Sequence, residues 1–290
     1  MFIALTLFGF PVRLQGEGGP RAWLRLLRGH GAPPSEQPVL TIVFVKTLAG
    51  FSRAGYSRHS SRRFLGAGFA VDYEHRRLYY PIRVRRRPAG GGRRRARYPL
   101  PQTVAFALCL LAEARGGRTV ANTASGNQAP LYLHASAVAT PRGALVFCGR
   151  STFGKSTISG RLLSAYERIA DDCSMILVGP LDRRRQARPR IIVLGSRKRR
   201  GRRPSRRQWA LPIAGVFWLK KSREFRLEPM SQAEAASLIV APVVNWRQPA
   251  AIRNRLLMVR ALLRAVPCRR LHFRKERRPL IALLRQHGYA

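Results

Sequence analysis

Residues 1–100 alternate short apolar runs with turn-forming residues, a pattern typical of strands. Met1–Val12 is apolar almost throughout, and Leu40–Val45 is a continuous run rich in β-branched residues. Phe69–Tyr73 and Arg77–Ile82 predict a hairpin that turns around Glu74–His75. We interpret the first run as a strand rather than a signal segment, because no basic residue precedes it and no small-residue cleavage pattern follows it.

One apolar segment breaks this β pattern. Thr103–Ala114 is hydrophobic on all sides, which predicts a buried helix that ends before Gly116-Gly117. The stretch Asn122–Gln128 that follows is small and polar, as expected of a connection between units. We therefore expect a β-rich N-terminal region over residues 1–120 and a main domain over residues 121–290.

The main domain mixes strand and helix patterns. Apolar runs predict strands at Leu131–Ala139, Ala144–Cys148, Ser174–Val178 and Ala210–Leu219, and the segment Cys268–Phe273 is also strand-like. Longer or amphipathic stretches predict helices at Lys155–Ala165, Ser231–Ile239, Leu256–Ala265 and Pro279–Arg285. Ser231 with Glu234 has the spacing of a capping box. The expected fold class is α/β (α+β), with helices on a mixed sheet.

The balance of charge adds an expected interaction. The sequence holds 55 Lys and Arg against 13 Asp and Glu, a formal net charge of +42. Most of the excess lies in bursts interleaved with Gly and Pro, which predicts loops: Arg83–Arg87, Arg93–Arg97, Arg183–Arg190 and Arg197–Arg207. Such a field attracts polyanions of any sequence. No recognition helix or other nucleic-acid-binding motif accompanies the bursts, so we expect nonspecific polyanion binding.

The distribution of cysteines and histidines limits which disulfide and metal sites the chain can form. The four cysteines are scattered and form no CxxC pair, which argues against a disulfide framework or a zinc knuckle and fits a cytoplasmic protein. The six histidines are equally dispersed. No apolar run reaches the roughly 20 residues that span a bilayer. A magnesium ion held together with a nucleotide stays compatible with this composition, because it needs only one or two protein oxygens.

The segment from Gly149 to Ser156 matches the phosphate-loop pattern GxxxxGK[ST] at every fixed position. A predicted buried strand enters it and a predicted helix leaves it. Backbone amides of such a loop point at phosphate oxygens, the lysine reaches the β- and γ-phosphates, and the serine hydroxyl binds magnesium. We expect ATP and Mg²⁺ as cofactors, with a binding set of Gly149, Arg150, Ser151, Thr152, Phe153, Gly154, Lys155, Ser156 and Thr157.

Asp171 and Asp172 form the one adjacent acidic pair in the chain. They follow Ser156 by about the length of a helix and a return strand, so they can reach the edge of the sheet beside the phosphate loop. One carboxylate there can hold magnesium, and the other can accept the proton of an incoming hydroxyl. We assign Asp171 to the metal with Ser156, and both aspartates to catalysis with Lys155.

His134 lies upstream in a strand of small residues, where a histidine is most often a core residue. However, the arrangement LHASAVA, ALVFCGRSTFGKST and RIADD resembles the catalytic core of the HPr kinase/phosphorylase family, one of the phosphoenolpyruvate-carboxykinase-like P-loop kinases. The resemblance puts His134, Lys155 and Asp172 on the family's catalytic histidine, lysine and aspartate. It puts Ser156 on the family's magnesium ligand and implies that the aspartate is the base toward a serine hydroxyl.

The resemblance covers roughly residues 125–290. The segments LPIAGVFWL, FRLEPMSQAEAASLI and AVPCRRLHF are similar to short HPr-kinase-like proteins encoded with lasso-peptide clusters, and the family commonly forms homo-oligomers. Two departures are visible. No Glu occurs between Cys173 and Arg223 to match the family's second magnesium ligand, and an arginine-rich stretch replaces the segment with its later catalytic arginine. We therefore expect no full phosphorylase activity.

The resulting hypothesis is a kinase that uses ATP and Mg²⁺ to phosphorylate a serine hydroxyl of a peptide or small protein, in lasso-peptide modification. Two alternatives stay open. One is a nucleic-acid-binding P-loop ATPase that uses the arginine bursts, although no apolar strand ends in Asp-Glu and no aromatic platform accompanies the arginines. The other is a catalytically degenerate regulator that binds nucleotide, consistent with the missing glutamate.

Overall fold

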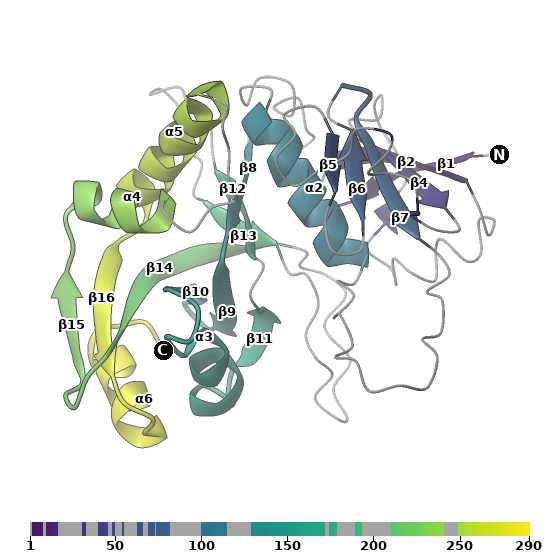
Figure 1. Ribbon diagram of the computed structural model, residues 1–290. Coiled ribbons are helices and arrows are strands. Elements are labelled where there is room, and N and C mark those ends of the chain that lie inside the picture. The colour runs from purple at the N-terminus through teal and green to yellow at the C-terminus, as the bar shows by residue number, and fades with distance from the viewer. Residues whose placement is uncertain are drawn as a thin grey trace. The chain divides into compact units, whose positions relative to one another are not determined.

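The computed structural model divides the chain into two compact units, 1–125 with 245–251 and 126–244 with 252–290 (Figure 1). Each unit has its own sheet and its own helices. The structure describes residues 2–7, 10–16, 31–32, 40–45, 48–49, 54, 63–65, 69–72, 74–81, 100–114, 129–171, 174–178, 189–192, 210–240 and 249–290.

The first unit is built on a mixed sheet in the order β3-β1-β2-β4-β7-β6-β5. β4 pairs in parallel with both β2 and β7, and the other pairs are antiparallel. The strand bounds are β1 Phe2–Leu7, β2 Phe10–Gly16, β3 Gly31–Ala32, β4 Leu40–Val45, β5 Arg63–Leu65, β6 Ala70–Asp72 and β7 Arg77–Pro81. This confirms the strand expected at 40–45 and the hairpin expected at 69–82.

Two expectations for the first unit need correction. The apolar run Met1–Val12 is not one strand but an antiparallel hairpin, in which Leu7 pairs with Phe10. Two consecutive apolar strands joined by a short turn look like one run, because hydrophobicity does not mark the reversal. Helix α2, Leu100–Ala114, begins three residues before the expected start. Its buried apolar face belongs to this unit's core, and Phe106 meets Phe69 edge to face with ring centroids 5.8 Å apart.

The second unit holds a nine-stranded mixed sheet. Its main order is β11-β9-β10-β14-β13-β12-β8, and β16 pairs with both β14 and β15. The strand bounds are β8 Ala129–Leu133, β9 Ala135–Thr140, β10 Gly143–Cys148, β11 Glu167–Ala170, β12 Ser174–Val178, β13 Arg190–Ile192, β14 Ala210–Lys221, β15 Arg226–Pro229 and β16 Cys268–Phe273. The two sheets and five α-helices of the described residues make the chain a mixed α/β protein.

Strand directions in the second unit gather several chain segments at one edge. β10, β14 and β16 run parallel, and β9 is antiparallel to both β10 and β11. The carboxyl ends of β10, β11, β14 and β16 therefore lie at the same edge as the amino end of β9. Open sheets of this kind bind ligands beyond the carboxyl ends of their strands.

Both faces of this sheet are buried. Along β10, Val146 and Cys148 belong to one core and Leu145 and Phe147 to the other, so the strand is apolar throughout. The first core includes residues of α4, Gln232–Val240, and α5, Pro249–Ala265. The second includes residues of η1, Ile158–Leu162, which continues the short helix α3, Lys155–Thr157, and of α6, Arg277–Gln286 (Figure 1). Helices on both faces hold the sheet, and hence its edge, in place.

The expected strands and helices of this unit are largely present, with two corrections. The run Leu131–Ala139 is not one continuous strand: it is interrupted at His134, and β8 pairs with β12 whereas β9 pairs with β10 and β11. The helix expected at Lys155–Ala165 ends at Leu162, and its second part is π-helical: Leu163 N donates to Ile158 O at 2.8 Å. The cap of α4 is as expected, with Glu234 N donating to Ser231 Oγ at 3.1 Å.

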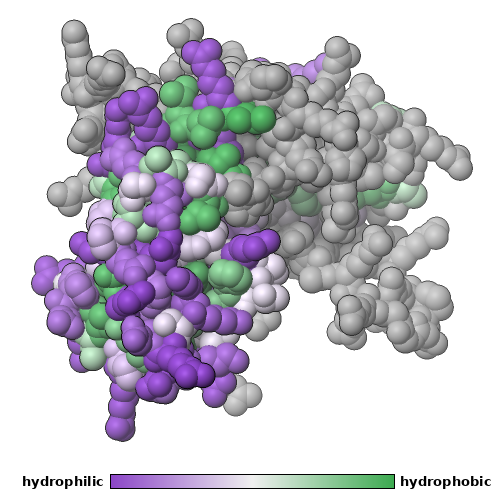
Figure 2. Space-filling view, turned by 60° about the vertical axis from the view of Figure 1, so that its left-hand side comes forward, coloured by the Kyte–Doolittle hydropathy of each residue, from purple (hydrophilic) through white to green (hydrophobic). Residues whose placement is uncertain are grey.

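The surface of the second unit is mostly hydrophilic on the face seen in Figure 2, with apolar patches among the charged side chains. Among the described residues, the exposed large apolar side chains are Ile252, Leu256 and Leu257, all on α5. No helix of the described residues is long and apolar enough to cross a membrane.

Candidate functional site

The loop from Gly149 to Ser156 joins the end of β10 to α3, as expected from its sequence. It is a compact turn, in which Phe153 N donates to Arg150 O at 3.2 Å and Ile158 N donates to Gly154 O at 2.9 Å. Gly154 has φ 94°, a left-handed conformation that glycine adopts without steric cost. Thr152, with φ 73°, adopts the same region without being glycine, so the loop carries local backbone strain.

The ammonium group of Lys155 lies inside this loop. Its Nζ donates to Gly149 O at 3.0 Å and to Arg150 O at 3.2 Å, and the residue is buried. The backbone of Lys155 is also fixed, because its carbonyl accepts from Ser136 Oγ at 2.9 Å and from Ser159 Oγ at 3.1 Å. The two carbonyls that accept from the ammonium are neutral, so these contacts do not offset its positive charge.

Ser156 and Asp171 meet on one side of the loop. Ser156 Oγ donates to Asp171 Oδ1 at 2.9 Å, and Arg168 Nη1 donates to Asp171 Oδ2 at 2.8 Å. Magnesium prefers oxygen ligands and usually takes only one or two from the protein. The hydroxyl and carboxylate that sequence reasoning assigned to the metal therefore fit a magnesium ion, with Arg168 as the competing cation on the second carboxylate oxygen.

Of the two other expected catalytic residues, Asp172 and His134, the structure describes only His134. Asp172 lies outside the described residues. His134 is half-buried at the break between β8 and β9, and the next residue, Ala135, pairs with Cys148 at the end of β10. The backbone at His134 thus lies at the edge where the phosphate loop begins.

Sequence reasoning missed a group of cations on the opposite side of the loop. A cavity of about 200 Å³ is lined by Gly154, Thr157, Lys221, Ser222, Phe273, Arg274 and Lys275. Lys221 is the last residue of β14, and Arg274 and Lys275 directly follow β16. Both strands could be predicted from the sequence, but the pairing of β14 with β10 and of β16 with β14 could not, because it brings β10 together with segments about 70 and 120 residues away in sequence.

A second cavity, of about 420 Å³, also adjoins the loop. It is lined by Phe153, Trp218, Leu219, Lys220, Glu234, Ser237, Leu238 and Arg270. Its walls combine the apolar side chains at the end of β14 with an ion pair between Arg270 and Glu234.

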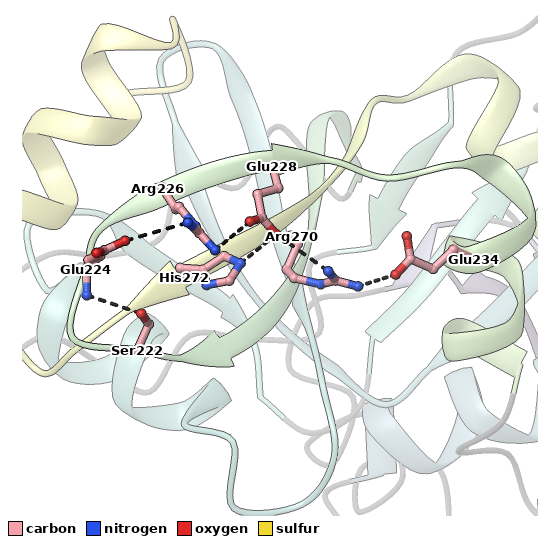
Figure 3. Close-up of polar contacts among 7 residues, drawn as sticks. All are labelled: Ser222, Glu224, Arg226, Glu228, Glu234, Arg270 and His272. Carbon is pink, nitrogen blue, oxygen red and sulfur yellow. Dashed lines mark hydrogen bonds and ion pairs between the residues drawn. The ribbon is translucent and has the colours of Figure 1, made fainter.

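That ion pair belongs to a charged network along β15 and β16 (Figure 3). Glu228 Oε2 lies 2.7 Å from His272 Nε2 and 3.5 Å from Arg270 Nη1, while Arg226 Nη2 lies 2.7 Å from Glu228 Oε1. The hydrogen bond to His272, together with the charges of His272, Arg226 and Arg270, lowers the pKa of the Glu228 carboxyl. The network ties α4 and β15 to β16 and gives the second cavity a fixed wall.

Cys148, which directly precedes the loop, is not a candidate nucleophile. Its thiol is buried in the core, and burial raises its pKa well above the ordinary cysteine value. A thiol nucleophile needs a lowered pKa and access. The candidate reactive groups at this edge of the sheet are therefore the oxygen and nitrogen atoms around the loop, not the Cys148 thiol.

Comparisons with known proteins show distant similarity to solved structures alone. No family model matches the chain, and no curated protein matches it. Among solved structures, the chain is similar to the Hpr(Ser) kinase/phosphatase from Coxiella burnetii at 13% identity, covering 54% of this chain and 95% of that one with a TM-score of 0.26. A TM-score this low does not establish a shared fold, so any functional conclusion has to come from the site itself.

Proposed function

We propose that the second unit is a kinase that binds ATP and Mg²⁺ at the phosphate loop and transfers the γ-phosphoryl group to a hydroxyl. The observation that carries the proposal is the pairing of two features. The Lys155 ammonium lies inside the loop, and Ser156 Oγ lies 2.9 Å from Asp171 Oδ1 at its side. The first suits the β- and γ-phosphates, and the second suits the metal that accompanies them.

Each residue then has a defined part in the transfer. The loop amides and Lys155 hold the phosphates and neutralise charge on the transferring group. Ser156 and Asp171 hold the magnesium ion, which when bound supplies further positive charge at the β- and γ-oxygens. The acceptor oxygen forms a bond to the γ-phosphorus as the bond to the β-phosphate oxygen breaks, and ADP leaves. The hydroxyl proton passes to a carboxylate, a role that we assign to Asp172, while His134 contacts the phosphates or the acceptor.

For the acceptor, we propose a serine hydroxyl of a peptide or small protein. The support is the sequence resemblance of residues 125–290 to HPr-kinase-like proteins, and to the short forms encoded with lasso-peptide clusters in particular. The chain's net charge of +42 would favour an acceptor that is neutral or acidic over a basic one. Labelled phosphate offered with peptides encoded beside this gene, followed by mass spectrometry, would identify the residue that is modified.

The test of the loop is transfer of labelled γ-phosphate by the wild type and by Lys155→Ala. We expect the substitution to lower transfer by roughly 10²–10³-fold, because it removes a charge aimed at the transferring group. Thermal unfolding of the two proteins checks that the fold is intact, and Lys220→Ala, on the neighbouring strand, controls for loss of one positive charge. Equal transfer by wild type and Lys155→Ala would remove the loop from the mechanism.

One observation favours a second candidate, a regulator that binds nucleotide without turnover. Arg168 occupies one oxygen of Asp171, and the sequence lacks the glutamate that serves as second magnesium ligand in the resembled family. Nucleotide binding by a wild-type protein that neither transfers nor hydrolyses the γ-phosphate would support this candidate. The nucleic-acid-dependent ATPase has no such support, since its arginine-rich segments lie outside the described residues. A flat response of ATP hydrolysis to added nucleic acid would argue against it.

A further inference from the structure

The strand order of the sheet determines on which side of the phosphate loop each charged group lies. The sheet runs from β11 through β9, β10 and β14 to β16, and the phosphate loop follows β10 in the middle. Asp171 follows β11 on one side. Lys221 ends β14, and Arg274 and Lys275 follow β16, on the other side. The acid assigned to magnesium and the cations that line the small cavity thus lie on opposite sides of the loop.

The placement of the acid and the cations on opposite sides of the loop indicates in which orientation a triphosphate would bind. Ser156 and Asp171 would hold the magnesium ion that accompanies the β- and γ-phosphates, so we place the terminal end of the triphosphate on their side of the loop. The α-phosphate and the nucleoside then lie toward β14 and β16. Gly154 and Thr157, at the exit of the loop, line the cavity on that side, so the cavity continues the loop rather than forming a separate site.

The cavity is suited to an anion. Among the residues that the structure describes, no carboxylate pairs with Lys221 or Lys275 and offsets their charges. Arg274 is held in place, with Nε 2.7 Å from Glu276 Oε1 and its guanidinium 5.8 Å from the Phe225 ring centroid. Of the three cations, Arg274 is the one that pairs with an acid within the described part of the chain, and Glu276 offsets that single charge.

The cavity walls are also fixed. Ser222 N donates to Phe273 O at 2.9 Å, which ties the end of β14 to the end of β16. The Phe273 ring lies against Gly154, where an added Cβ would come within 3.1 Å of its Cζ. A pre-formed group of cations binds an anion without first having to be ordered, which favours affinity.

We propose that Lys221, Arg274 and Lys275 bind the α-phosphate of the nucleotide, with Ser222 and Thr157 as neutral hydrogen-bonding partners. The proposal rests on the nucleotide binding to the loop but not on phosphoryl transfer. It makes the site selective for nucleoside di- and triphosphates over pyrophosphate, because pyrophosphate can occupy the β- and γ-positions and leave the cavity empty. An anionic group of the acceptor is the competing occupant, and the experiment separates the two.

The test compares Mg-ATP with Mg-pyrophosphate by titration calorimetry at high salt, which screens the general charge of the protein. The variant is Lys221→Gln/Lys275→Gln. We expect it to raise the Kd for Mg-ATP by about tenfold, since two partly exposed charge-assisted contacts are lost. We expect the Kd for Mg-pyrophosphate to change by less than about twofold. Lys220→Gln is the matched control and should leave both values unchanged, because its side chain lines the other cavity.

Four results would overturn the proposal. If the double variant weakened the binding of Mg-ATP and Mg-pyrophosphate equally, the effect would come from the general positive charge of the protein. The same would hold if Lys220→Gln weakened Mg-ATP binding as much as the double variant does. An unchanged Kd for ATP with a raised KM for the acceptor would assign the cavity to the acceptor. Phosphoryl transfer separates this proposal from the proposed function: if the wild type transfers no γ-phosphate while the double variant weakens Mg-ATP binding and spares Mg-pyrophosphate binding, the kinase assignment fails and the cavity assignment stands. Absence of ATP binding to the wild type would overturn both.

Discussion

At the scale of single residues, the phosphate loop depends on backbone conformations as much as on side chains. Gly154 is left-handed and lies against Phe273, so both its φ and its lack of a side chain are needed. Thr152 shares that conformation without being glycine. Strained residues of this kind cluster where a binding site requires a fixed shape. The loop therefore holds its form at a local cost that the buried strand β10 and the surrounding core offset.

The left-handed backbone of Gly154 and its contact with Phe273 predict the effect of Gly154→Ala. The substitution should lower the free energy of unfolding by about 1–2 kcal/mol from the left-handed backbone alone, with an added cost from the contact with Phe273. Gly288→Ala is the matched control, because Gly288 also has a positive φ, 74°, but an added Cβ there meets no atom within 4 Å. Urea denaturation measures both variants. Equal losses would show that the ring contact has no energetic weight.

Residue types alone could predict the central part of this site. The spacing of Gly149, Gly154, Lys155 and Ser156 is a local motif, so the sequence contains it complete. The position of Asp171 followed from the length of one helix and one strand, and the structure puts its carboxylate at the Ser156 hydroxyl. Lys221, Arg274 and Lys275 could not be found this way, because isolated cations in a chain with 55 Lys and Arg carry no signal.

At the scale of elements, strands were easier to predict than their partners. The strands at 40–45, 144–148 and 174–178 follow from apolar runs, and the structure has each of them, as it has the strand expected at 268–273. Their order in the sheet depends on long-range packing. β14 inserts between β10 and β13, and β16 then adds beside β14, although nothing near any of these strands specifies its neighbour. The break at His134 is likewise invisible in a run of small apolar residues.

The network that joins β15, β16 and α4 makes stability depend on pH. Because the pKa of Glu228 is lowered in the folded state, its contribution is fully present above the unfolded value, about 4.3, and is lost as the pH falls through the folded value. We therefore expect Glu228→Gln to destabilise the protein at neutral pH and to differ little from the wild type at the acidic end. Urea denaturation at several pH values between 7 and that end measures the difference.

Glu224→Gln is the control for that experiment. Glu224 belongs to the same network, but its side chain is 72% exposed and lies 3.6 Å from Arg226. Exposed ion pairs of this kind contribute little, so we expect a small effect at every pH. A loss in Glu228→Gln that stays constant across the pH range would contradict the proposed role of its ionised carboxylate.

At the scale of the whole molecule, the residues that form the core of the second unit are not those that carry most of the net charge. The second unit buries a two-faced sheet of ordinary composition, whereas the largest arginine bursts lie outside the described residues. The formal charge of +42 acts over the molecule as a whole. Long-range attraction of anions therefore needs no particular surface, while recognition of one anion needs the fixed groups at the edge of the sheet.

This difference predicts two kinds of anion binding with different salt dependence. Duplexes of unrelated sequence should bind with similar affinity, and that affinity should fall steeply and linearly in a plot of log K against log salt. Mg-ATP binding should fall much less, because few charges are neutralised and they lie within the loop. Fluorescence anisotropy with two duplexes of different sequence measures the first and calorimetry the second. A strong preference for one duplex would instead favour the nucleic-acid-dependent ATPase.

The π-helical segment Ile158–Leu162 has a consequence for comparing this chain with others. A π turn amounts to one residue inserted into an α-helix, and everything beyond it is rotated by about 100°. The insertion turns both Leu162 and Leu163 into the core. A related chain with a regular helix here would carry one residue fewer between the phosphate loop and the acid that follows β11. We therefore expect alignments of such chains to need a single gap within residues 158–162, and those built without it to pair Asp171 with the wrong position.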